Sequence, residues 1–197
     1  MEEILGLLNS QQGQQLIAGA SSKLGLEGGQ VQGLLSMALP ALVSGLNNNT
    51  NQPGGADSLM NALGAHDGSI LDNVAGFLNQ GDFSDGSKIL GHILGGSQGN
   101  VQNALSKSSG VDSGSIGQLL SMAAPVLMGA LGKETQQQGL DSNGLSDMLT
   151  QVVSGAQQNH GQEMSMVEKL LDQNNDGSVI DDVASMGMSL FKSFMSK

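Results

Sequence analysis

Oxygen-bearing side chains near the C-terminus have the spacing of a calcium-binding loop. Calcium prefers hard oxygen ligands, and a loop of the EF-hand or dockerin type supplies them from positions one, three and five, followed by glycine at six and a backbone carbonyl at seven. Residues 172–182 (DQNNDGSVIDD) satisfy each of these positions. The candidate ligands are Asp172, Asn174, Asp176, Ser178 and Asp182. The sequence therefore offers a calcium site in this segment.

The end of this loop departs from the calcium-binding pattern. Position nine is Ile180, and position twelve, where a bidentate carboxylate belongs, is Val183. Asp182 lies one residue early, so it could close only a weaker, non-standard cage. The alternative is a solvated turn in which Ser178 caps the helix that follows. Both interpretations stay open on the sequence alone.

The other residues that could carry chemistry form no recognisable catalytic group. His66, His92 and His160 lack the spacing of a transition-metal site. There is no cysteine, which excludes disulfides, thiolate metal sites and a cysteine nucleophile. No nucleophile elbow, phosphate loop or dinucleotide fingerprint occurs. We therefore expect no enzymatic activity and no cofactor other than calcium.

Charge and composition argue against several classes of partner. The formal net charge is −11 and all seven basic residues are lysines, so phosphate groups would be repelled. Aromatic residues make up 2% of the chain and are all phenylalanine, which disfavours stacking on bases. The longest apolar stretches, 34–46 and 119–131, fall short of the roughly 20 residues that span a bilayer. The acidic N-terminus does not read as a secretory signal. We expect a cytoplasmic protein without nucleic-acid or membrane partners.

One segment of small and apolar residues occurs twice. LLSMALP at 34–40 returns 85 residues later as LLSMAAP at 119–125. Apolar residues at spacings of three and four predict an amphipathic helix in each copy. Pro40 and Pro125 fall inside these helices, and an interior proline kinks a helix or ends it. We expect two long helices interrupted at the same place.

The Asp-Gly-Ser triplets at 67–69, 85–87 and 176–178 predict helix starts, with serine as the cap. Loops rich in Asn, Pro and Gly or in Gln and Gly are expected at 47–55 and 132–143. No segment alternates like a strand. The expected helices lie near 2–8, 13–24, 29–46, 57–64, 69–79, 86–95, 98–108, 114–132, 144–158, 163–171 and 178–196.

These features predict an all-α fold of many short helices in two related helical repeats. Residues 1–96 form the first repeat. Residues 97–197 form the second, with an inserted loop and helices, the Asp-rich loop and a C-terminal amphipathic helix. The repeats could form a bundle or share one joint core, since short glycine-rich helices often need each other to bury their faces. The apolar face of the last helix contains Val183, Met186, Leu190, Phe191, Phe194 and Met195.

Three segments carry a family resemblance. They are the small-residue helix with its central proline (34–46 and 119–131), GAHDGSILDN at 64–73 and DGSKILGHILG at 85–95. Together they resemble a bacterial family of unknown function, the YidB-like proteins (domain-of-unknown-function family 937), here in two tandem copies. The resemblance covers most of the chain. It implies an all-helical fold and assigns no activity and no functional residues.

Three functions follow from the sequence, and the first is preferred. It is a non-enzymatic bacterial helical protein that binds an unknown protein partner or self-associates. The C-terminal apolar face either packs in the protein's own core or, if it is exposed, marks a partner groove, a dimer interface or a membrane surface. The alternative is a calcium-binding or calcium-stabilised protein that uses the Asp172–Asp182 loop. The third is nucleic-acid binding by a helix-turn-helix-like arrangement, which the negative charge opposes.

Overall fold

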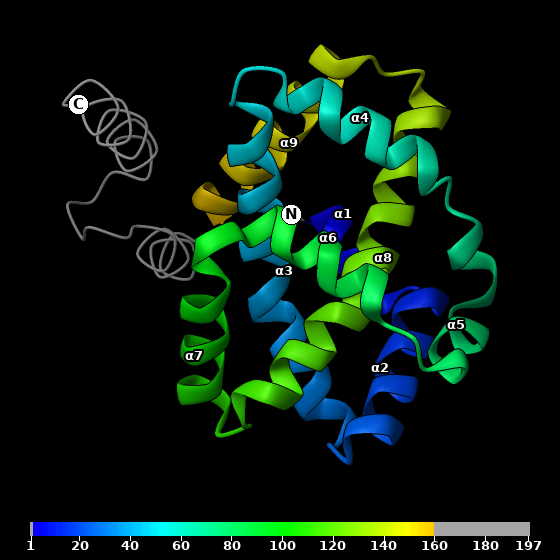
Figure 1. Cartoon of the computed structure of the whole chain (residues 1–197), viewed down its shortest axis with the longest axis vertical. Helices are drawn as coiled ribbons and strands as arrows, with labels where there is room; N and C mark the ends of the chain where they lie inside the picture. Colours follow the sequence, from blue (N-terminus) through cyan, green and yellow to red (C-terminus); the bar gives the residue numbers. More distant parts are fainter. Residues whose placement is uncertain (1, 160–197) are drawn as a thin grey trace, which may run out of the picture.

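The computed structural model describes residues 2–159, and side chains over 6–155. This part of the chain is helical and contains no strand, which confirms the all-α expectation for it (Figure 1). The calcium loop, His160, the C-terminal apolar face and the helices expected at 163–171 and 178–196 lie outside the described residues.

The helices follow the expected order along the chain. The α-helices are α1 (Glu2–Asn9), α2 (Gln11–Leu24), α3 (Gly28–Thr50), α4 (Gly55–Ala65), α5 (Val74–Gln80), α6 (Ser84–Leu94), α7 (Gln98–Ser109), α8 (Ser113–Gln138) and α9 (Ser142–Asn159). Two short 3₁₀ helices are η1 (Ser69–Asn73) and η2 (Gly95–Ser97).

Glycines end two helices at positions 85 residues apart in the chain. Gly25 follows α2 with φ +67°, and Gly110 follows α7 with φ +73°. This left-handed conformation favours glycine because a Cβ would strain it. The amide of each glycine donates to the carbonyl of a serine four residues earlier, Ser21 and Ser106. The same local chemistry thus closes α2 and α7.

The two proline-containing helices do not end at their prolines. α3 continues through Pro40 to Thr50, and α8 continues through Pro125 to Gln138. Every residue from 38 to 46 and from 119 to 129 is buried. A proline removes one backbone hydrogen bond from the helix. Packing of the helix on all sides stabilises it by more than this loss, so the helix continues past the proline. The expectation that a helix ends near residue 46 or 132 was wrong, and the connecting loops are correspondingly shorter.

Two of the three Asp-Gly-Ser triplets, 67–69 and 85–87, fall within the described residues and lie at helix starts, but neither serine caps its helix. At each start an aspartate accepts a hydrogen bond from the backbone amide two residues later. Asp67 Oδ1 accepts a 2.9 Å hydrogen bond from the Ser69 amide just before η1. Ser87 does not begin α6, which starts at Ser84, where Asp82 Oδ1 accepts a 3.0 Å bond from the Ser84 amide. The backbone hydrogen bond lowers the pKa of Asp67 and of Asp82, because it stabilises the charged form.

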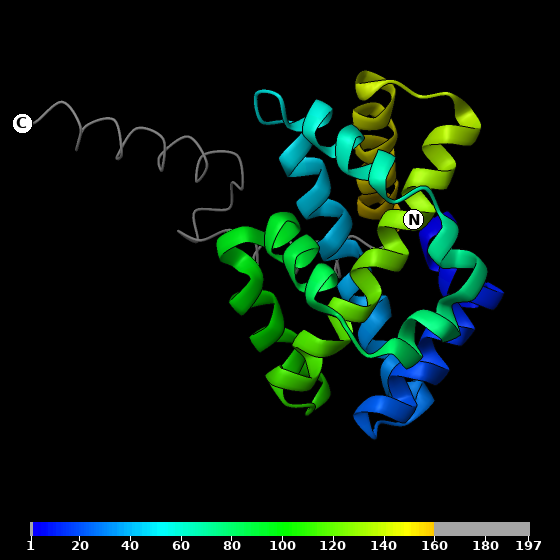
Figure 2. The same cartoon turned by 45° about the vertical axis from the view of Figure 1, so that its right-hand side comes forward.

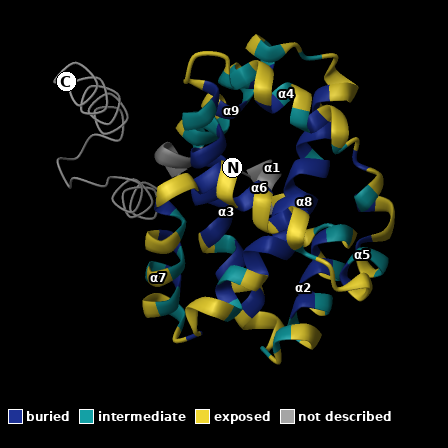
Figure 3. Ribbon diagram, viewed as in Figure 1, coloured by how far each residue is buried: buried dark blue, intermediate teal, exposed yellow. Residues whose placement is uncertain are grey.

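A single hydrophobic core joins helices from both expected repeats. It extends from Leu8 in α1 to Leu149 in α9 without a break at residue 96. α3 and α8 run through its centre, which Figures 1 and 2 show from two directions and Figure 3 shows as the most buried part of the fold. The joint core is therefore the arrangement that the described residues adopt. Whether 1–96 and 97–197 are separate folding units stays a prediction.

Among the described residues, α8 is the one helix long and apolar enough to cross a membrane. Most of it is buried within the domain. The central helix of a soluble core meets the same criteria, so α8 is weak evidence for a membrane span.

Candidate functional site

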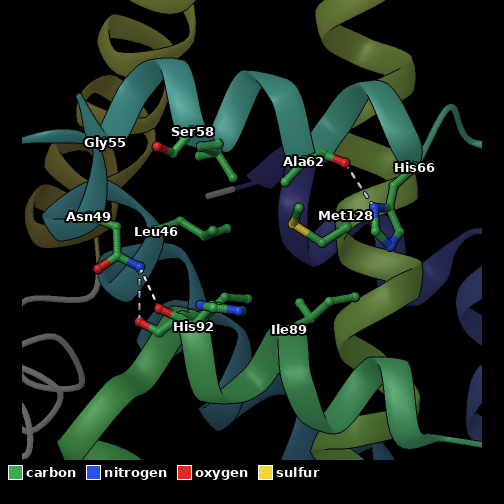
Figure 4. A pocket seen from close by; sticks show the side chains of 11 residues that line it. Leu46, Asn49, Gly55, Ser58, Ala62, His66, Ile89, His92 and Met128 are labelled. Carbon is green, nitrogen blue, oxygen red and sulfur yellow. Dashed lines mark hydrogen bonds between the residues drawn. The ribbon is translucent and has the colours of Figure 1, made fainter.

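A hollow lined mainly by apolar side chains lies between α4 and α6. Figure 4 shows the two helices as facing walls, with α3 and α8 beneath them. The walls contribute Leu59 and Ala62 from α4 and Ile89 and Ile93 from α6. Leu46 of α3 and Met128 of α8 complete the apolar side chains of the lining. The cavity has a volume of about 380 Å³. We call this hollow the α4–α6 groove.

A histidine and an aspartate link the two walls at one end of the α4–α6 groove. His66 follows the last residue of α4, and its Nδ1 lies 2.8 Å from the carbonyl oxygen of Ala62. A carbonyl only accepts hydrogen bonds, so Nδ1 carries a hydrogen and caps the helix end. His66 Nε2 lies 3.2 Å from Asp85 Oδ2 in the first turn of α6. The contact is an ion pair when the ring carries both protons.

An asparagine links α3 to α6 at the opposite end. Asn49 Nδ2 donates to the carbonyl oxygen of His92 at 2.8 Å and approaches that of Ile93 at 3.4 Å. These are carbonyls of the last turn of α6, which have no partner inside the helix. Figure 4 shows Asn49 and His66 at opposite ends of the hollow. The groove is thus bounded at each end by polar contacts, and the lining between them is mainly apolar, with Ser58 and the His92 ring as its further polar groups.

The α4–α6 groove offers mainly apolar surface to a ligand. His66 uses both ring nitrogens in contacts with the protein itself. Within the described part of the chain, no three His, Asp or Glu side chains gather to hold a metal ion. The hollow instead removes apolar surface of a ligand from water, which is favourable by about 25 cal/mol per Å².

A second hollow, between α2 and α5, gives less indication of a ligand. It has a volume of about 410 Å³ and is lined by Gln15, Ala18, Gly19, Ser22, Lys23, Ala75, Leu78 and Asn79. Half of these residues are polar, and no hydrogen bond or ion pair joins their side chains to one another within the described residues. We therefore take the α4–α6 groove as the candidate site.

His66 and His92, whose spacing in the sequence assigns them to no common site, line the same hollow in the structure. His66 also caps α4. The candidate calcium ligands from Asp172 to Asp182 lie outside the described residues, so the structure does not place them.

Together, the helices and the groove define an all-α domain with a mainly apolar hollow on its surface. The chain belongs to a family described as bacterial protein of unknown function (DUF937), which matches residues 6–134. This match runs without interruption across residue 96. The YidB-like assignment and the presence of two tandem copies stay predictions. No curated protein and no solved structure matches the chain.

Proposed function

We propose that this protein is a non-enzymatic interaction module that takes the apolar face of a short helix into its α4–α6 groove. The observation that carries the proposal is the combination of a mainly apolar middle with polar closure at both ends. Helix-in-groove recognition uses such a hollow to accept side chains spaced at i, i+3 or i+4, and i+7. The polar boundaries would set the position of the guest along the groove.

The dimensions of the groove fit about three helical turns. Gly55 and His66 mark its extent along α4, a separation of about 16 Å at 1.5 Å per residue. A contact of this size buries well under the roughly 1,200 Å² of a stable complex. We infer that binding is weak and reversible, as in transient regulatory contacts.

A groove-filling substitution tests this proposal. Ala62→Phe places a ring in the hollow without removing any core side chain, since Ala62 is only partly buried on the wall. Ala65→Phe is the matched control, because Ala65 is exposed on the same helix and does not line the groove.

The probe is an 18-residue helical peptide of leucine and lysine, titrated into the ¹⁵N-labelled full chain. We expect chemical-shift changes centred on Leu59, Ala62, Ile89 and Ile93, lost in Ala62→Phe and kept in Ala65→Phe. A scrambled peptide of the same composition controls for attraction by charge. Equal shifts with the scrambled peptide, or shifts spread over other helices, would reject the proposal.

The Asp172–Asp182 loop carries a second proposal, calcium binding. It rests on the ligand spacing at positions one, three and five and on glycine at six. Calorimetry with calcium, and melting with and without a chelator, test it. We expect heat release and a higher melting temperature, both abolished by Asp176→Ala. The absence of both effects in the unmodified chain would end this proposal.

A further inference from the structure

We propose that the α4–α6 groove is occupied by this chain's own C-terminal segment, residues 183–195, folded back onto the same molecule. This inference rests on the proposed function and identifies the helix that binds in the groove. The segment would act as an internal competitor that an outside partner must displace.

The apolar pattern of the segment has the spacing that a groove between two helices accepts. Val183, Met186, Leu190 and Phe194 follow one another at intervals of three and four. On the helix that the sequence predicts over 178–196, these positions form one stripe. The flexible thioethers of methionine suit an irregular hollow. Such a stripe is stable in water only when it is covered.

Apart from its hollows, the surface of the described residues has little apolar area against which the C-terminal stripe could pack. Within residues 6–155, Met37 is the one large hydrophobic residue that counts as exposed, at 40%. Of the two hollows compared above, the α4–α6 groove is the one lined mainly by apolar side chains. An apolar stripe therefore gains most by burial there.

Charge favours the same contact. Residues 183–197 contain Lys192 and Lys197 and no acidic residue. The helices that form the walls carry Asp57, Asp85 and Lys88, a formal net charge of −1, and acidic residues outnumber lysines over the described part of the chain. The basic end of the chain is therefore drawn toward an acidic domain.

The intervening chain is long enough to reach the groove. α9 ends at Asn159 and packs beside the C-terminal half of α3, where Thr150 Oγ1 donates to Asn47 Oδ1 at 3.0 Å. Residues 160–182 span up to about 50 Å even if 163–171 and 178–182 are helical, at 3.3 Å and 1.5 Å per residue. A domain of this length is about 40 Å across. A tether of this kind gives an effective concentration of the order of millimolar, which makes even a weak contact populated.

Paramagnetic broadening in the full chain tests the docking directly. The chain has no cysteine, so Ser193→Cys accepts a single nitroxide label beside the apolar stripe. We expect the label to broaden the amides of Ala62 in α4 and Ile93 in α6. It should affect Ala20 of α2 much less, since Figures 1 and 2 place α2 and α4 at opposite ends of the domain. Ala62→Phe, or Leu190→Ser with Phe194→Ser, should abolish the broadening, and Ala65→Phe should retain it.

Mixing separates folding back from pairing between molecules. Spin-labelled unenriched protein is added to ¹⁵N-labelled protein without a label. Broadening of Ala62 and Ile93 in this mixture alone would assign the groove to a second copy and overturn the inference. The absence of broadening in both samples would overturn it as well.

The leucine–lysine peptide separates failure of this inference from failure of the proposed function. If the segment occupies the groove about nine tenths of the time, the Leu190→Ser, Phe194→Ser variant should bind the peptide about tenfold more tightly than the unmodified chain. Equal affinity in both proteins would overturn the inference and leave the proposed function standing. No peptide binding to either protein, together with no broadening, would reject both.

Discussion

Two buried serine hydroxyls differ in whether they have a hydrogen-bond partner. Ser44 in α3 is 7% exposed, and its Oγ has no partner among the described residues. Ser121 in α8 is 6% exposed, and its Oγ donates to the Gly117 carbonyl at 2.8 Å. An unpaired buried hydroxyl costs about 1–3 kcal/mol, whereas a paired one contributes about 1 kcal/mol.

This difference predicts opposite effects of the same substitution. Ser44→Ala should raise the free energy of unfolding by about 1 kcal/mol, because it removes an unsatisfied group and improves helix propensity. Ser121→Ala, the matched control, should lower it by up to about 1 kcal/mol. Urea denaturation measures both. A loss of stability in Ser44→Ala would show that its hydroxyl finds a partner in solution.

Asp112 provides a pH-dependent contribution to stability at the start of α8. Its Oδ1 accepts a 2.9 Å hydrogen bond from the Ser115 amide, and its Oδ2 accepts a 2.6 Å bond from the Ser115 hydroxyl. The hydrogen bond from the Ser115 hydroxyl, followed by the bond from the Ser115 amide, lowers the pKa of Asp112 below the ordinary value of an aspartate, because both bonds stabilise the charged form. A lowered folded pKa means that the stabilisation is complete above the unfolded pKa and is lost as pH falls through the folded one.

We therefore expect Asp112→Ala to lower the melting temperature at pH 7 and to have a much smaller effect at pH 2. Asp72→Ala is the control, because Asp72 is exposed and accepts none of the hydrogen bonds found within the described residues. Thermal unfolding followed by circular dichroism at the two pH values checks the prediction. An Asp112→Ala deficit that stays constant down to pH 2 would contradict it.

At the scale of helices, Gly86 allows α6 and α8 to pack at a short distance from each other. Gly86 is buried, and a Cβ there would meet the carbonyl oxygen of Ser121 and lie 3.1 Å from Pro125 Cδ. A backbone atom cannot move aside as a flexible side chain can, so the helices would have to separate. This crossing also brings Asp85 to His66 at the end of the α4–α6 groove.

Gly86→Ala should therefore reduce stability by about 1–3 kcal/mol through overpacking. Gly91→Ala lies on the same helix, with no heavy atom within 4 Å of the added Cβ, and should gain about 0.5–1 kcal/mol. Chemical denaturation of both variants measures the difference. Similar effects of the two substitutions would show that α6 and α8 are not in close contact.

Helix order could be predicted from the sequence because its signals are local. The left-handed Gly25 and Gly110 and the spacing of apolar residues act within a few positions of the backbone. The lengths of α3 and α8 were missed because Asn47–Thr50 and Gly132 have the composition of loops. Gly132 lies instead against the carbonyl of His66, a contact between segments far apart in sequence. Tertiary packing here overrides local preference.

The α4–α6 groove could not be predicted from the sequence. Its lining residues, such as Leu59 and Ile93, have the same types and spacing as fully covered core residues. What distinguishes them is the distance between two helices that do not close over each other, and no local pattern encodes that distance. His66 and His92 were noticed, but their shared position depends on the same long-range arrangement.

For the whole molecule, the shared core implies that residues on both sides of position 96 unfold together. Val31 in α3 and Ile116 in α8 are both fully buried and lie 85 residues apart. Both belong to the same continuous core. A domain with one such core usually unfolds in a single cooperative transition.

Hydrogen exchange of these two helices tests whether the halves are independent. Ile116→Val should lower stability by about 1 kcal/mol. If the core is one unit, the slowest amides of α3 and α8 should lose protection equally, because both exchange through global unfolding. Val31→Ala provides the reciprocal experiment and should weaken α8 as much as α3. If each substitution affected only its own half, residues 1–96 and 97–197 would be separate folding units, and the contact between α3 and α8 would be an interface between them.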